Sequence, residues 1–179
     1  MITRQFSEKD INIKHQDINM IGIMSDSHDN LDAIRKAVKL FNSKDLDIVI
    51  HAGDLISPFT ANDFQKLDPE LVAVYGNNDG EREGLKSAFK DTCLLEDFKE
   101  ISVEGWKFSI IHGTNPAIVD SLRKSGNYDV VIRGHTHKLE VLNGNTMLIN
   151  PGELCGYVSS KQTVVLLDTD DLSFEVIYL

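Results

Sequence analysis

Short apolar runs recur along this chain, and most of them stop abruptly at a glycine or at polar residues. In the first half these runs cover residues 20–24, 46–50 and 71–75. A short apolar run bounded by turn residues is typical of a strand that is buried on both faces. A stretch with helical spacing of its apolar residues follows each run, so the first half predicts βα units with a parallel sheet.

Two of the helices expected in this half have a recognisable start. Asn30 is the expected N-cap of a helix over residues 31–41, and Ser57 is the expected N-cap of a second helix that begins with a proline. The third helix is expected over residues 84–90. Three of the large apolar side chains are assigned to the core rather than to a partner-binding surface: Leu31, Phe59 and Phe64.

The second half of the chain predicts a meander of strands with one more helix. This helix is expected after Asn115-Pro116, and a strand over residues 130–132 follows it. Hairpins are expected at residues 101–111, 139–149 and 163–178. Residues 96–100 are interpreted as a charged turn and residues 150–153 as a loop. Together the two halves predict an α/β fold in which two mixed β-sheets lie face to face and are flanked by helices.

The length of 179 residues fits one domain. We expect a single domain over residues 19–179, preceded by an N-terminal arm over residues 1–18. The arm is polar and mixed in charge, and an edge strand, a short helix and a mobile segment all remain open for it. Its His15 is expected to be exposed and to have no part in the site. The arm and the hairpin strands are also the candidate edges for a homodimer.

Composition narrows the classes of function. The 28 acidic residues outnumber the 18 basic ones, and the formal net charge is −10. Phosphates are repelled by such a chain at long range, so nucleic acid and anionic membranes are unfavourable partners. No apolar run reaches the roughly 18 residues of a bilayer-spanning helix, and the opening residues do not resemble a signal peptide. We therefore expect a cytoplasmic protein, in which Cys93 and Cys155 are buried small residues rather than a disulfide.

Donor side chains follow the predicted strands at their carboxyl ends, which is where open α/β sheets place their ligand sites. In the stretch over residues 130–137, Gly134 ends a strand and His135 and His137 point the same way if the chain stays extended. The seven candidate donors are Asp26, His28, Asp54, Asn77, His112, His135 and His137. The alternative is that these are ordinary loop and capping residues, a risk that every short motif carries.

The chemistry of this donor set favours a pair of metal ions. Nitrogen and oxygen donors without thiolate suit manganese, iron, nickel, cobalt or zinc, and they argue against a closed structural zinc site. Seven protein ligands are too many for one such ion and fit two ions with a shared carboxylate. We expect manganese first, with nickel, iron, cobalt or zinc as alternatives.

Five ordered motifs carry a resemblance to a known family. They are Asp26-x-His28, Gly53-Asp54, Gly76-Asn77-x-Asp79, His112-Gly113 and Gly134-His135-Thr136-His137. In this order they resemble the motifs of the calcineurin-like metallophosphoesterase superfamily, and the size resembles its small bacterial and archaeal phosphodiesterase branch. The resemblance runs from about residue 20 to residue 152, where the sequence Asn150-Pro151-Gly152 is also typical of that branch.

The resemblance implies a division of the ligands and a reaction. One ion would be bound by Asp26, His28 and His137, and the other by Asn77, His112 and His135, with Asp54 bridging. The reaction implied is hydrolysis of a small phosphoester by direct attack of a metal-bridging water, and a diester is favoured over a monoester as the substrate. No covalent enzyme intermediate is expected.

One position departs from the family pattern. Asn78 stands where many members carry a histidine that protonates the leaving group, and where this branch often carries a cysteine. An amide has no titratable proton near neutral pH, so we expect a preference for good leaving groups such as aryl esters. With Asp54 and His112, Asn78 is the third residue we place at the reaction itself. Asp79 is expected to orient His112 or its loop, and His51 to pack or support rather than to bind metal.

Two further functions remain as alternatives. A non-catalytic scaffold that resembles the retromer subunit would keep this fold and bind other proteins, but its metal ligands would be degraded, whereas none of the seven is missing here. A nuclease that resembles the recombination exonucleases would need added domains and a basic track for DNA, and this chain offers neither.

Overall fold

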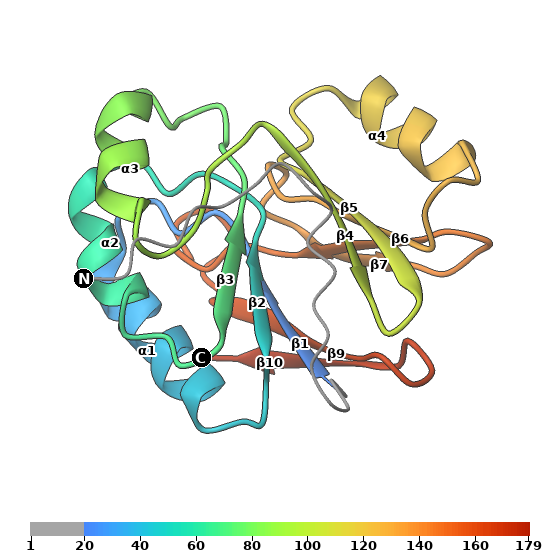
Figure 1. Cartoon of the computed structure of the whole chain (residues 1–179), viewed down its shortest axis with the longest axis horizontal. Coiled ribbons are helices and arrows are strands. Elements are labelled where there is room, and N and C mark those ends of the chain that lie inside the picture. Colours follow the sequence, from blue (N-terminus) through green and yellow to red (C-terminus); the bar gives the residue numbers. More distant parts are fainter. Residues whose placement is uncertain (1–19) are drawn as a thin grey trace.

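The computed structural model describes residues 20–179, and the strands in that part of the chain form two five-stranded sheets (Figure 1). The predicted arm at residues 1–18 and its His15 lie outside the described residues. The first sheet contains β1 (Met20–Met24), β2 (Ile48–His51), β3 (Glu70–Ala73), β9 (Thr163–Asp168) and β10 (Phe174–Tyr178). Its order is β10-β9-β1-β2-β3; β1, β2 and β3 are parallel, β9 is antiparallel to β1, and β10 is antiparallel to β9.

The second sheet has the order β4-β5-β6-β8-β7. Its strands are β4 (Phe98–Val103), β5 (Trp106–Ile111), β6 (Val130–Ile132), β7 (Leu139–Leu142) and β8 (Met147–Pro151). The neighbours β5, β6 and β8 are parallel, whereas β4 and β7 are antiparallel edge strands. Both sheets are therefore mixed, as the sequence predicts.

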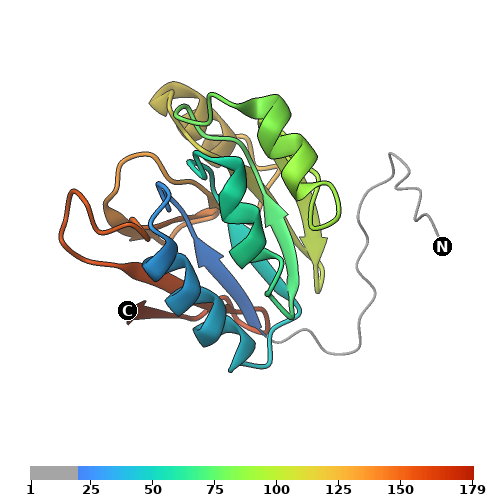
Figure 2. The ribbon, with the colours of Figure 1, turned by 90° about the vertical axis from the view of Figure 1, so that its left-hand side faces the viewer.

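Helices cover the outer face of each sheet. Figure 2 shows α1, α2 and α3 in front of the first sheet, and α4 lies beside the second sheet in Figure 1. The helices are α1 (Leu31–Asn42), α2 (Ala61–Phe64, entered through a 3₁₀ turn at Pro58–Thr60), α3 (Arg82–Phe89) and α4 (Pro116–Lys124). Within residues 20–179, no helix has the length and apolar character needed to cross a membrane.

Alternation along the strands divides the core into three apolar layers. On β1, Ile21 and Ile23 face the second sheet, where they join Phe108 and Ile110 of β5 in a layer between the two sheets. Another layer packs the first sheet against α1, α2 and α3, with Phe41 and Phe64 fully buried in it. The third and smallest layer places Val119 of α4 on the second sheet. The result is four layers of secondary structure, in the order helices, sheet, sheet, helix.

The structure differs from the sequence prediction at two strand boundaries. Residues 98–100, expected in a charged turn, form the start of β4 and pair with residues 109–111. The charge of Lys99 is unlike that of a core residue, so the sequence pattern did not predict a strand here. In the structure Lys99 is only 7% exposed, and its amine lies 3.0 Å from Glu96. Asn150 and Pro151, expected in a loop, pair with β7 as the end of β8.

The helix after β2 also differs. Asn30 caps α1 as expected, since its side chain accepts a hydrogen bond from the backbone N–H of Ala33. Ser57 makes no such cap, and its hydroxyl donates instead to the Asp29 carboxylate. The chain first forms a 3₁₀ turn, which changes the direction of the side chains. Phe59 is therefore 51% exposed, and its assignment to the core is wrong, whereas Phe64 is buried.

Candidate metal centre

Loops at the carboxyl ends of strands from both sheets meet at one edge of the molecule. Asp26 and His28 follow β1, and Asp54 follows β2. From the second sheet, His112 follows β5 and His137 follows β6 at a short distance. All seven donors named from the sequence lie at this edge, and their contacts connect them in two groups.

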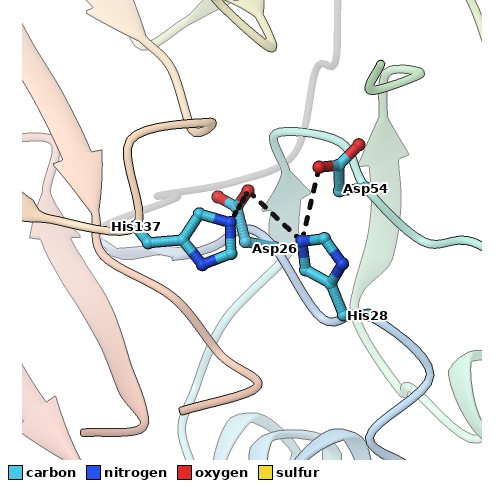
Figure 3. A group of neighbouring side chains, drawn as sticks. All are labelled: Asp26, His28, Asp54 and His137. Atoms are coloured by element: carbon cyan, nitrogen blue, oxygen red, sulfur yellow. Dashed lines mark ion pairs between the residues drawn. The ribbon is translucent and has the colours of Figure 1, made fainter. Parts of the chain in front are cut away.

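The first group contains Asp26, His28, Asp54 and His137, each of which offers a donor atom within 4.8 Å of the others (Figure 3). The His28 Nε2 atom lies 3.3 Å from Asp54 Oδ2 and 3.9 Å from Asp26 Oδ1. The His137 Nε2 atom lies 3.5 Å from Asp26 Oδ1. Two carboxylates and two imidazoles therefore face one small volume.

The second group shares Asp54 with the first. The same Oδ2 atom lies 3.3 Å from His112 Nε2, and His112 Nε2 is 3.0 Å from the Asn77 side-chain oxygen. The rings of His112 and His135 are 5.3 Å apart. Asp54 therefore stands between the two groups, at the place expected of a bridging carboxylate.

The hydrogen bonds of the histidines fit bound cations. His112 Nδ1 donates to the Ala52 carbonyl at 2.8 Å, and His137 Nδ1 donates to Glu153 at 2.8 Å. In a neutral ring the Nε2 atom then carries a lone pair, and in both rings that atom faces oxygen atoms. His28 Nε2 is buried and has no hydrogen-bond partner in the described part of the chain. Lone pairs that face carboxylates require a cation between them, either a proton or a metal ion.

The charges at the centre shift the pKa values in the same sense. The carboxylates of Asp26 and Asp54 raise the pKa of His28 to about 9. Burial alone raises the pKa of Asp54, but His112 and His28 outweigh it and hold the pKa of that carboxyl well below its usual range. Desolvation lowers the pKa of His112, but the contact with Asp54 outweighs it and the net shift is upward. The site therefore attracts positive charge, which is the property that a metal centre needs.

Backbone strain accompanies this arrangement. Several of the candidate ligands have a positive φ, which is uncommon for residues with a side chain and clusters at functional sites. They are Asp26 (53°), His28 (41°), Asp54 (62°), His135 (71°) and His137 (57°). Tight turns after each strand therefore aim the side chains at the common centre.

Two glycines permit the close approach of the loops. A Cβ atom on Gly76 would lie 2.0 Å from Asp54 Oδ1, and one on Gly134 would lie 1.9 Å from Ser25 Oγ and 2.6 Å from Asp26 Oδ2. No side chain fits at either position without displacing a carboxylate of the centre. The lack of space for a Cβ atom is the physical reason why glycine precedes the candidate ligands Asn77 and His135.

A family model for the calcineurin-like phosphoesterase superfamily domain matches residues 20–172. The chain belongs to this superfamily. It is 43% identical over 164 residues to a phosphodiesterase of Methanocaldococcus jannaschii, with 89% of this chain and 98% of the relative covered. A solved archaeal phosphodiesterase superposes with a TM-score of 0.86 at 43% identity, over 89% of this chain and 99% of that one. These similarities confirm the resemblance drawn from the five motifs and the fold predicted from the apolar runs.

More distantly similar solved structures share the fold. Vps29 of Chaetomium thermophilum superposes with a TM-score of 0.68 at 16% identity, over 90% of this chain and 96% of that one. At this level of identity the similarity concerns the arrangement of sheets and helices alone.

Asp79 and His51 support the loops of this phosphoesterase centre. The buried Asp79 carboxylate accepts hydrogen bonds from the backbone N–H groups of Gly76 (2.6 Å), Ile56 (2.6 Å) and Asp54 (3.2 Å). It therefore orders the loops rather than His112. His51 is fully buried with Nε2 3.0 Å from Ser27 Oγ, and burial lowers its pKa to about 4.

Asn78 makes a contact that the sequence did not suggest. Its side-chain amide donates to Asp54 Oδ2 at 2.8 Å, and its backbone N–H donates to Asp54 Oδ1 at 2.9 Å. Both contacts help to keep the carboxylate ionised and oriented toward the histidines. The residue that replaces the family's histidine therefore acts on the shared carboxylate in this structure.

Two residues next to the centre were missed by sequence reasoning. Glu153 is fully buried beside His137, and a lone glutamate in an expected loop gave no signal for this. Burial opposes ionisation of Glu153, but His137 and the backbone N–H of Ser159 outweigh it, and its pKa falls to about 2. Arg133 donates from Nε to the Gly134 carbonyl and from Nη2 to the Gly113 carbonyl, each at 3.1 Å, and so connects the loops of His135 and His112.

Proposed function

We propose that this chain is a phosphodiesterase that depends on two divalent metal ions and hydrolyses small phosphodiesters by direct attack of water. The single observation that carries the proposal is the position of Asp54 Oδ2, which lies 3.3 Å from a histidine nitrogen of each donor group. The similarity to the archaeal phosphodiesterases supports the diester as the substrate class.

The residues divide between two ions as the resemblance implies. Asp26, His28 and His137 would hold one ion, Asn77, His112 and His135 the other, and Asp54 both. When bound, two such ions lower the pKa of a water between them and neutralise the charge of the phosphate. Manganese is the ion we propose first, with nickel, iron, cobalt or zinc as alternatives, because the donors are imidazole, carboxylate and amide.

The side chains of the chain itself set the limits of the reaction. Asn78 donates to Asp54 and carries no titratable proton, so it gives none to the departing oxygen. The leaving group must then depart as an anion, which favours aryl esters of low pKa over alkyl esters. We therefore propose that this phosphodiesterase has only modest turnover of alkyl monoesters.

Location and partners belong to the same proposal. Cys93 and Cys155 are both free, and a cytoplasmic location is consistent with this. Burial raises the pKa of both thiols to about 12, so both are protonated near neutral pH in the metal-free protein. The net charge of −10 argues against nucleic acid as the substrate. A homodimer remains a prediction, which a measurement of the oligomeric state in solution would test.

The test combines metal analysis with a substrate panel. Protein purified without chelator should contain close to two equivalents of metal, and bis-aryl phosphodiesters should be hydrolysed with manganese, nickel, cobalt, zinc or magnesium added in turn. Aryl phosphodiesters should exceed alkyl monoesters in kcat/KM. Metal far below two equivalents together with no hydrolysis under any ion would favour the scaffold alternative and refute the proposal.

A further inference from the structure

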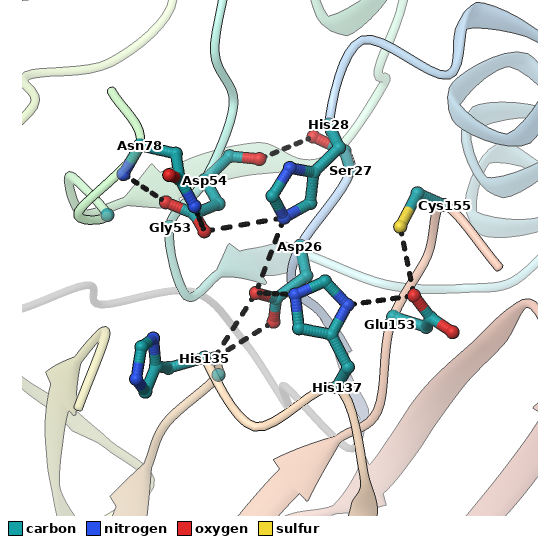
Figure 4. A network of polar contacts seen from close by, with 12 residues as sticks. Asp26, Ser27, His28, Gly53, Asp54, Asn78, His135, His137, Glu153 and Cys155 are labelled. Atoms are coloured by element: carbon teal, nitrogen blue, oxygen red, sulfur yellow. Dashed lines mark hydrogen bonds and ion pairs between the residues drawn. The ribbon is translucent and has the colours of Figure 1, made fainter. Parts of the chain in front are cut away.

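Glu153 has contacts that no motif of the family accounts for. Its Oε2 atom lies 2.8 Å from His137 Nδ1, and Cys155 Sγ donates to the same atom at 3.1 Å (Figure 4). The backbone N–H of Val158 donates to Oε1 at 3.0 Å, and that of Ser159 donates to Oε1 as well. One carboxylate therefore connects a candidate metal ligand to the loop that follows it.

An ionised carboxylate in this buried position is unfavourable unless its partners compensate for the lost solvation. Glu153 is fully buried, and no lysine or arginine of the described residues forms an ion pair with it. Burial of an ionised carboxylate without a cationic partner is strongly unfavourable, and neutral N–H donors offset it only in part. A glutamine of the same shape would avoid this penalty, so the charge itself requires an explanation.

The explanation lies in the two nitrogens of His137. A carboxylate only accepts hydrogen bonds, so the proton of a neutral His137 ring must sit on Nδ1. The other nitrogen, Nε2, then presents its lone pair 3.5 Å from Asp26 Oδ1, inside the first donor group. Orientation by such a partner commonly fixes the tautomer of a metal-binding histidine.

The loop over residues 154–160 is held at the same point. The Leu154 N–H donates to the Ser25 carbonyl at 2.9 Å and the Cys155 N–H donates to the Asp26 carbonyl at 3.0 Å. The Asn30 side chain donates to the Cys155 carbonyl at 2.8 Å. The loop is thus fixed both to the end of β1 and to Glu153, so that the carboxylate has little freedom to leave His137.

We infer that Glu153 is a positioning residue, which fixes the tautomer and direction of His137 and so sets the affinity of one of the two metal sites. The inference rests on the proposed function, because His137 is a metal ligand only if the centre binds metal. Glu153 acts through His137 and has no contact with substrate. Its removal should therefore affect the group of Asp26, His28 and His137 and leave the group of Asn77, His112 and His135 intact.

The test compares Glu153→Gln with a matched control, Asp63→Asn. Asp63 is also a buried carboxylate, 4% exposed, but it pairs with Arg35 and Lys66 on the helix side of the first sheet. In Glu153→Gln the amide can donate to His137 Nδ1 and so favour the wrong tautomer. Titration of metal-free protein with manganese should show one of two sites weakened by about 10- to 100-fold, whereas Asp63→Asn should bind both ions as the wild type does.

A second measurement keeps the inference testable if Glu153→Gln does not fold. The ¹⁵N chemical shifts of His137 in the metal-free wild type should report the tautomer with the proton on Nδ1 at a pH where the ring is neutral. A proton on Nε2, or two unchanged manganese sites in Glu153→Gln, would overturn the inference while leaving the proposed function standing. If the wild type binds no metal at all, the proposed function fails and the effect of Glu153 on metal affinity fails with it, whereas the shifts of His137 still show whether Glu153 fixes the tautomer.

Discussion

Replacement of Gly76 by alanine tests how closely the loops of the centre must approach. The added Cβ atom would lie 2.0 Å from Asp54 Oδ1 and 2.3 Å from the Asp54 backbone nitrogen. Since real Cβ atoms stay at least 3.0 Å from such neighbours, Asp54 must move by about 1 Å. A displacement of this size at a reacting centre lowers rates by roughly 100-fold, and the overpacking itself destabilises the fold by about 1–3 kcal/mol.

The matched control is Gly80→Ala, in the same loop, where an added Cβ meets nothing within 4 Å. Both variants should be compared by manganese titration, by hydrolysis of a bis-aryl phosphodiester and by thermal unfolding. We expect Gly76→Ala to lose metal affinity and activity by about 100-fold and Gly80→Ala to keep both. If Gly76→Ala bound two ions with wild-type affinity, Asp54 would not be the shared ligand and the geometric argument would fail.

The remaining predictions concern the centre directly. His135→Ala should abolish hydrolysis, and retained turnover would contradict its role. Unfolding monitored by circular dichroism should stay cooperative, because the ring lies in a loop. Asn78→Ala removes the amide that donates to Asp54 Oδ2, so metal affinity should fall by roughly 10-fold while the preference for aryl esters remains. The pKa of His28 is raised to about 9 in the metal-free protein, so the proton there stabilises the fold below pH 6.5 and this contribution is lost as the pH rises through 9. Metal must displace that proton, and manganese affinity should therefore rise about tenfold per pH unit up to pH 9 and then level off. A flat profile in calorimetry between pH 7 and 9 would count against His28 as a ligand.

Most of the fold could be predicted because its strands are buried on both faces. Continuous apolar runs such as residues 20–24 and 130–132 have few other uses in a protein of this size, and both are strands. The exceptions are informative. Residues 98–100 form an edge strand whose pairing with β5 is a tertiary contact, and the 3₁₀ turn at Pro58–Thr60 turned Phe59 outward in a way that helical spacing cannot foresee.

The site could be predicted in part for a similar reason. Each motif ligand follows the carboxyl end of a strand, so position in the sequence was enough to predict that Asp54 and His112 lie at the same edge. Contacts that depend on how separate loops pack were not visible. Glu153 reaches His137 across 16 residues, and Arg133 reaches Gly113 across 20. Asn78 was correctly singled out, but its contact with Asp54 required the folded loop.

The donors of the centre come from both sheets, and the apolar layer between the sheets helps to fix how far apart Asp54 and His112 stand. Ile50 of β2 and Ile110 of β5 are both fully buried in that layer. It therefore works as a spacer for the metal ligands, although none of its side chains reaches the centre. A larger or smaller side chain there would retune the separation between Asp54 and His112 from a distance, so that the hydrophobic interior of this protein is also part of its chemistry.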